Sequence, residues 1–203
     1  MDNYAYIIAS MPVLQPDGAK AEKLVARDLL DEIREQLSAR DAAVLDQLLE
    51  GYNPDRLNAE FYENALQHRN RFIREWFRFD LKLRNATVAY LNESLGRVDD
   101  QDMILLEGME TDEVPEANAV RKVLNCGDIL NRERGLDELR WDKIDELTML
   151  DSLDLEVILG FVTKLKIIDR WLQLDPDSGR ALFRRFVEDL RSTYDNKKQN
   201  LTI

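Results

Sequence analysis

The chain has 203 residues, of which 44% are hydrophobic and 33% are charged, and its formal net charge is −12. This composition is typical of a folded domain and excludes a disordered tail. An acidic protein repels phosphate groups, so the net charge argues against nucleic acid and anionic membrane surfaces as partners.

The single cysteine, Cys126, excludes an intrachain disulfide and favours a reducing compartment. The apolar start, Tyr4–Leu14, has no Lys or Arg before Lys20, so it lacks the basic region of a signal peptide. The apolar run Val157–Val162 is far too short to cross a bilayer. We therefore predict a cytoplasmic protein without direct membrane insertion, whose apolar start packs on its body.

The first quarter of the chain has the apolar spacing of helices. Leucines and an isoleucine recur at helical intervals over 19–37, and a second helix is predicted over 42–50, ending at Gly51. Asn53-Pro54-Asp55 then combines a capping side chain, a proline and an acid, which is the pattern of a helix start.

A long stretch from about residue 60 to 95 contains neither Gly nor Pro. This predicts one long central helix, which Gly96 ends. Its apolar residues fall on several faces, so we expect neighbouring helices on more than one side.

The second half begins with an acidic connection. Eight acids and no base lie between Asp99 and Glu116, which predicts an acidic segment over about 97–115. Helices are then predicted near 116–125 and 128–134, broken at Gly127 and Gly135, and over 136–150, 152–174 and 176–194.

The predicted fold is all-α: an elongated multi-helix bundle. No alternating run is long enough for a sheet, apart from Tyr4–Ile8. We expect a single helical unit over 1–203. An alternative is a division into two sub-bundles, 1–96 and 116–195, joined by the acidic segment.

Reactive groups are scarce. His68 is the only histidine, and catalytic triads, zinc sites and di-iron sites need histidines or carboxylate spacings that the chain lacks. Cys126 is interpreted as a buried, inert thiol. Asp100-Gln101-Asp102 begins like a calcium loop, but Leu105 stands where a glycine is needed. We predict no catalytic, cofactor-binding or metal-binding residue, and no enzyme activity.

Basic residues form a stripe at helical spacing in this acidic chain. The stripe can pair with the acidic segment, face a protein partner or, against the net charge, bind nucleic acid. We call this set the basic stripe and treat it as a candidate partner interface: Arg71, Arg74, Arg78 and Lys82.

Acids at i, i+4 and i+8, Glu138, Asp142 and Glu146, share one helical face. Like charges at this spacing repel unless they are paired. Pairing on a solvated face, a network between helices and a contact to another protein are the alternatives. The predicted polar network consists of Arg84, Arg140, Asp145 and Glu146.

Several blocks of the sequence are distinctive. They are the start Asn3–Pro12, the helix Phe79–Asn85, the block Leu136–Trp141 with Asp145–Thr148, and the closing helices with Lys164–Trp171 and Phe183–Arg185. Through these blocks the chain resembles an uncharacterised bacterial family encoded next to subunits of V-type (A/V-like) ATPases. The family carries no established catalytic residues.

The resemblance implies association with the ATPase, in the place of its C (or d) subunit, an all-helical cup that seats the central rotor stalk on the membrane ring. The expected function is that of a non-catalytic subunit or an assembly or coupling factor. Its partners would be other V-type ATPase subunits on the stalk or membrane-ring side, which would hold it at the inner membrane as a peripheral protein. The alternatives are a free-standing helical adaptor without a link to proton pumping and, third, an enzyme.

Overall fold

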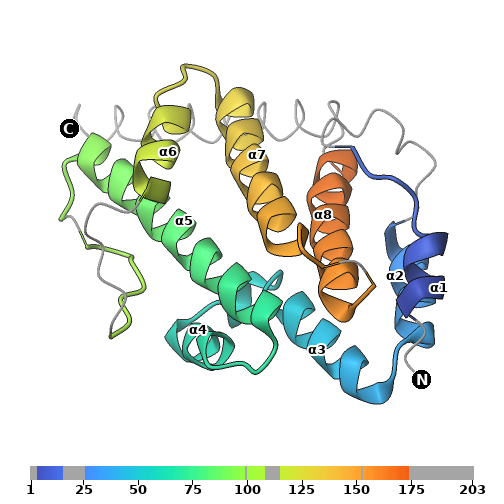
Figure 1. Cartoon of the computed structure of the whole chain (residues 1–203). Helices are drawn as coiled ribbons and strands as arrows, with labels where there is room; N and C mark the ends of the chain where they lie inside the picture. The colour runs from blue at the N-terminus through green and yellow to red at the C-terminus, as the bar shows by residue number, and fades with distance from the viewer. Residues whose placement is uncertain (1–3, 16–25, 99, 108–114, 152, 174–203) are drawn as a thin grey trace, which may run out of the picture.

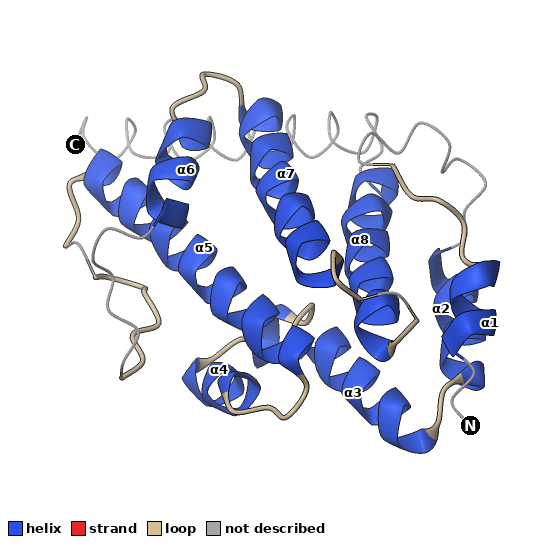
Figure 2. Ribbon diagram, in the orientation of Figure 1, coloured by secondary structure: helices blue, strands red, loops and turns tan. Residues whose placement is uncertain are grey.

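The computed structural model describes residues 4–15, 26–98, 100–107, 115–151 and 153–173, and the regular elements of these residues are helices (Figures 1 and 2). The all-α prediction is confirmed. The helices are α1 (Tyr4–Ser10), α2 (Ala26–Gln36), α3 (Ala39–Glu50), the 3-10 turn η1 (Pro54–Arg56), α4 (Ala59–Leu66), α5 (Arg71–Leu95), α6 (Pro115–Leu124), α7 (Ile129–Thr148) and α8 (Leu155–Gln173).

The apolar start of the chain forms α1. Its Ile7 is 1% exposed, and α1 packs against α8. The alternating run therefore forms a helix and not a strand, and its burial follows from tertiary packing. Tyr4 also donates a hydrogen bond to Asp41 Oδ2 of α3 at 2.8 Å.

The expected single helix over 60–95 is wrong, because the chain breaks between α4 and α5. The Asn70 side chain accepts a hydrogen bond from the Ile73 N–H at 3.1 Å and caps the new helix. The turn lets α4 fold back onto α5, where Phe61 meets Phe77 edge-to-face at 4.9 Å. The free energy gained by burying these rings exceeds the free energy lost where the turn interrupts the helix for four residues.

The long helix that remains, α5, is the centre of the fold. It packs against α4, α6, α7 and α8, and in Figure 1 it runs diagonally from the upper left to the lower middle, below α6 and α7. Gly96, in the left-handed conformation at φ 63°, ends it as predicted.

The expected helix break at Gly135 is also wrong, since α7 continues through that glycine from Ile129 to Thr148. A Cβ on Gly135 would lie 2.6 Å from Val123 Cγ1 of α6. The glycine serves close approach of two helices instead of ending one. The predicted helix over 176–194 lies outside the described residues.

One hydrophobic cluster extends from Ile7 of α1 to Ile168 of α8. It takes in residues from both sides of the acidic segment, among them Phe77 before it and Ile144 after it. Each fully buried side chain of this size stabilises the fold by about 1.5–3 kcal/mol before conformational entropy is subtracted. The proposed division into sub-bundles stays a prediction.

Candidate partner interface

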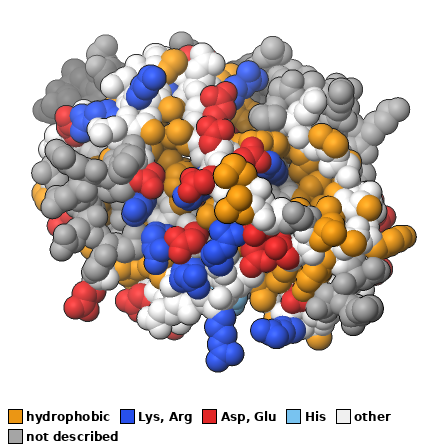
Figure 3. Space-filling view, in the orientation of Figure 1, with side chains coloured by type: hydrophobic (Ala, Val, Ile, Leu, Met, Phe, Trp, Pro, Cys, Tyr) orange, Lys and Arg blue, Asp and Glu red, His pale blue; other side chains and the backbone are white. Residues whose placement is uncertain are grey.

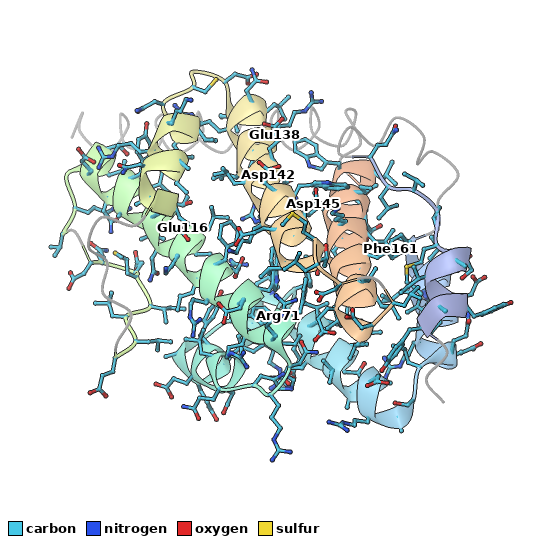
Figure 4. The ribbon with its side chains drawn as sticks, viewed as in Figure 1. Arg71, Glu116, Glu138, Asp142, Asp145 and Phe161 are labelled. Atoms are coloured by element: carbon cyan, nitrogen blue, oxygen red, sulfur yellow. The ribbon has the colours of Figure 1, made fainter. Side chains whose placement is uncertain are left out.

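Arg71, the first residue of the basic stripe, ties the start of α5 to the connection between α7 and α8 (Figure 4). Its Nη2 donates to the Leu147 carbonyl at 2.9 Å and to Asp151 Oδ2 at 2.5 Å. Charge-assisted hydrogen bonds of this kind are the strong ones, so this side chain fixes the position of the connection.

The next two arginines of the basic stripe share one acid of their own helix. Arg78 Nη1 lies 2.8 Å from both carboxylate oxygens of Glu75, and Arg74 Nε lies 3.5 Å from Glu75 Oε1. Arg74 also donates to the His68 carbonyl at 2.9 Å. Lys82 is half-buried and makes no ion pair with any residue that the structure describes. The described ion pairs of the stripe therefore do not involve the acidic segment.

The connection between α7 and α8 carries a feature that sequence reasoning missed. Met149, Leu150 and Leu153, which we call the apolar tip, are 75%, 86% and 59% exposed. The sequence pattern could have predicted this feature. The three residues follow Leu147, the last buried position of α7, and precede Leu155, the first buried position of α8. They belong to neither apolar stripe.

Polar contacts hold the base of the apolar tip. Asn70, the cap of α5, donates to Glu156 Oε1 of α8 at 3.0 Å. Burial raises the pKa of Glu156, and the neighbouring carboxylates of Asp154 and Asp151 raise it further. Together with Arg71, Asn70 anchors both ends of the connection to the start of α5.

Acids follow the outer face of α7, where Figure 4 shows Glu138, Asp142 and Asp145. Glu138 and Asp142 are exposed and make no ion pair within the described part of the chain. Arg134 does not pair with Glu138 but lies over the ring of Trp171, 5.5 Å from its centroid. This face is a solvated, acidic surface.

The four residues of the predicted polar network have separate partners. Arg84 bonds Asp80 at 2.6 Å and Arg140 bonds Asp137 at 2.9 Å, each on its own helix. Asp145 bonds Lys164 of α8, and Glu146 bonds Lys143 at 2.8 Å. No hydrogen bond or ion pair among the described residues joins two of the four directly, although the charges of Arg84 and Arg140 both act on Tyr52 and Tyr62.

Those tyrosines belong to a buried polar cluster centred on Asp80, which is 5% exposed. Tyr62 donates to Asp80 Oδ2 at 2.7 Å, beside the Arg84 contact to the same oxygen. Burial raises the pKa of Tyr62, and the Asp80 charge raises it further. Tyr52 is 37% exposed as a residue, yet burial of its hydroxyl likewise raises its pKa. The sequence signal for this cluster was the i,i+4 spacing of Asp80 and Arg84.

A second buried acid, Asp137, ties α7 to α8. It is 6% exposed and accepts from Arg170 Nη2 at 2.5 Å and from Trp171 Nε1 at 2.7 Å, besides Arg140. Asp80 and Asp137 are each hydrogen-bonded on several sides, which is the arrangement of structural ion pairs.

The predicted reactive groups lie apart from these clusters. Cys126 is exposed, so the expectation of a buried thiol is wrong; it sits in the short turn after α6, where its side chain meets no core. His68 is half-buried and its Nδ1 accepts from the Asn70 N–H at 3.1 Å. Within the described segments, no group of three or more His, Cys, Asp or Glu side chains could hold a metal ion.

Figure 3 shows hydrophobic, basic and acidic side chains side by side in the middle of one face, over the region where α5 meets the end of α7. The described helices include none with the length and apolar character needed to span a bilayer.

No curated protein and no solved structure matches the chain. A family model described as "Protein of unknown function (DUF2764)" matches residues 50–194, which is well over half of the chain and includes α4 to α8. The protein therefore belongs to this family of unknown function (DUF2764).

Proposed function

We propose that the protein is a non-catalytic subunit, or an assembly or coupling factor, of a V-type ATPase, and that it acts through protein–protein contacts on the cytoplasmic side. The carrying observation is the resemblance of Leu136–Thr148 to the family encoded beside such ATPases. That block forms most of α7 and supplies Leu136, Asp137, Trp141, Ile144 and Leu147 to the buried interior. The residues that carry the resemblance thus build a scaffold, and its outer faces are left for partners.

The other resembling blocks have the same structural role. Phe79–Asn85 lies in the middle of α5 and contains the buried Asp80 with its Arg84 partner. Lys164–Trp171 lies in α8 and brings Arg170 and Trp171 to Asp137. A protein whose specific residues hold helices together, and whose surface carries separate basic, acidic and apolar areas, is suited to joining other subunits.

The proposal is tested by recovering the tagged full-length protein from its native cytoplasm and detergent-solubilised membranes and identifying the bound proteins by mass spectrometry. Stalk and catalytic-head subunits of the ATPase are expected. Their absence, with other proteins enriched, would overturn the proposal and favour the helical adaptor.

Two charge reversals refine the test. Lys82→Glu changes a residue without an ion pair among the described residues, so recovery of the ATPase should fall while the melting temperature stays the same. Arg71→Glu also breaks two internal bonds and should lower the melting temperature. Arg27→Glu on α2 is the matched control, because Arg27 is exposed and pairs only weakly with Asp31 at 3.9 Å.

A further inference from the structure

The apolar tip is an exposed surface in the part of the chain that the structure describes. Met149, Leu150 and Leu153 are more than half exposed, and the bonds from Arg71 to Leu147 and Asp151 hold the connection from which they project. A backbone bond from the Asp151 N–H to the Thr148 carbonyl at 3.1 Å fixes the turn beneath them. Large apolar side chains grouped on a held surface mark an interaction site.

The basic stripe continues from the apolar tip along α5. At 100° per residue, Arg71, Arg78 and Lys82 lie on one side of the helix, and Arg71 touches the connection that carries the tip. Lys82 lies about 16 Å further along the axis, given a rise of about 1.5 Å per residue. The stripe alone therefore has about the length of three helical turns.

Cations exceed acids toward the far end of this line. Arg71 bonds Asp151 and Arg74 and Arg78 share Glu75, while Lys82 makes no ion pair among the described residues. Of the other acids near the base of the tip, Glu146 pairs with Lys143, whereas Glu156 and Asp154 accept from the neutral Asn70 side chain and Val157 N–H. These neutral donors do not offset a carboxylate charge, so the cation excess lies at the Arg78–Lys82 end of the stripe and not at the tip.

We propose that the apolar tip and the basic stripe form one docking surface for an amphipathic helix of another protein, whose apolar side chains cover Met149, Leu150 and Leu153 and whose acidic side chains face Arg78 and Lys82. The inference rests on the proposed function only in taking the protein to act by protein contacts. Because the docking surface is basic along α5, the partner helix should carry its acids on the flank that faces α5.

A protein partner fits this surface better than a membrane. The exposed acids Glu138 and Asp142 stand on the neighbouring outer face of α7 and repel anionic headgroups. The same two acids disfavour a partner that is acidic on all sides.

A photo-reactive phenylalanine analogue at position 150 of the tagged full-length chain tests the proposal in the native cell. Irradiation should join it to one segment of another protein, and sequencing of the cross-linked peptide should show an amphipathic helix with acids on one flank. The same analogue at Val13, which is 89% exposed on the segment after α1, is the control and should not reach that segment. A cross-link to lipid, a cross-link to a second copy of this chain, or no product would each overturn the inference.

A synthetic peptide of the cross-linked segment then measures the two contributions with the purified protein. Leu150→Glu should weaken its binding about tenfold or more, since a charged side chain replaces an apolar one that the peptide buries. Lys82→Glu should weaken it as well, while Arg27→Glu should leave it unchanged. If the segment belongs to a protein outside the ATPase, the proposed function fails and the docking surface stands; if ATPase subunits co-purify without this cross-link, the reverse holds.

Discussion

Tyr62 and Asp80 are joined inside the protein by a hydrogen bond of 2.7 Å between the tyrosine hydroxyl and Oδ2 of the carboxylate. The bond links α4 to α5 across the break that the sequence did not reveal, and Tyr62 is fully buried. A buried carboxylate is tolerated only when its oxygens are bonded, so this contact and the one to Arg84 are needed together.

Replacing Tyr62 by Phe removes that hydroxyl and leaves Asp80 with one fewer donor. We expect the free energy of unfolding in urea to fall by about 1.5–3 kcal/mol, the range for hydrogen bonds to charged groups. Tyr6→Phe, at a tyrosine that is 63% exposed, should change it by less than about 0.5 kcal/mol. Equal effects at the two positions would show that the bond to Asp80 does not stabilise the fold.

Gly160 allows α8 to approach α7 closely. A Cβ at this position would lie 2.7 Å from Thr148 Cγ2 and 3.2 Å from Ile144 Cγ2. Thr148 cannot easily turn away because its hydroxyl donates to the Ile144 carbonyl at 2.9 Å. Gly160→Ala should therefore lower the stability by about 1–3 kcal/mol, despite the better helix propensity of alanine.

Two matched variants separate the clash from other effects of Gly160→Ala. Thr148→Ser removes the opposing methyl group and keeps the hydroxyl, so the double variant should regain at least half of the lost stability in the same urea titration. Gly127→Ala, at a glycine whose added Cβ meets nothing within 4 Å, should be nearly neutral. A double variant no more stable than Gly160→Ala alone would place the strain elsewhere.

His68 should make the stability depend on pH. Burial lowers its pKa from the ordinary value of 6.5, and the nearby charge of Arg74 lowers it too. Between the lowered pKa and 6.5 the unfolded chain binds a proton that the folded chain does not. The free energy of unfolding should therefore rise with pH through this interval and lose its dependence on His68 above 6.5.

Because His68 is the only histidine, its ring proton can be followed by NMR without assignment of other histidines. The titration midpoint in the folded protein should lie below 6.5, and His68→Gln should remove this part of the pH dependence of urea unfolding. A midpoint at or above 6.5 would contradict the effect of burial.

Replacing Asp137 should also lower the free energy of unfolding. Asp137→Asn keeps the shape of the side chain but removes the charge that Arg140, Arg170 and Trp171 share. We expect a loss of about 1.5–3 kcal/mol and a shift in the emission of Trp171, whose indole N–H loses a charged acceptor. Asp169→Asn, at a half-buried acid of α8 that bonds Gln173, is the control and should have a small effect in both measurements.

The sequence predicts helices correctly where the apolar spacing and the capping residues agree. The helix over 42–50 appears as α3, Gly96 ends α5, and the helix expected over 152–174 appears as α8. Each depends on residues within one or two turns of each other, which is the range over which helical periodicity and caps act.

The same local rules failed where a tertiary contact reversed them. Gly135 looked like a helix end but faces Val123, and the stretch 60–95 looked continuous but bends at Asn70 so that Phe61 can reach Phe77. A glycine or an asparagine has more than one role, and only the neighbouring helix selects it.

The candidate interface, too, has features that the sequence predicts and features that only the structure shows. The sequence by itself determined an acidic all-α protein with cations at helical spacing on one stretch of chain, because composition and periodicity are properties of the chain alone. Only the tertiary structure decided that Arg71 bonds Asp151, that Asp80 lies between Tyr62 and Arg84, and that Met149, Leu150 and Leu153 remain exposed beside the basic stripe. Partners 18 to 80 residues apart meet through the packing of helices, and no spacing along the chain encodes which residues that packing brings together.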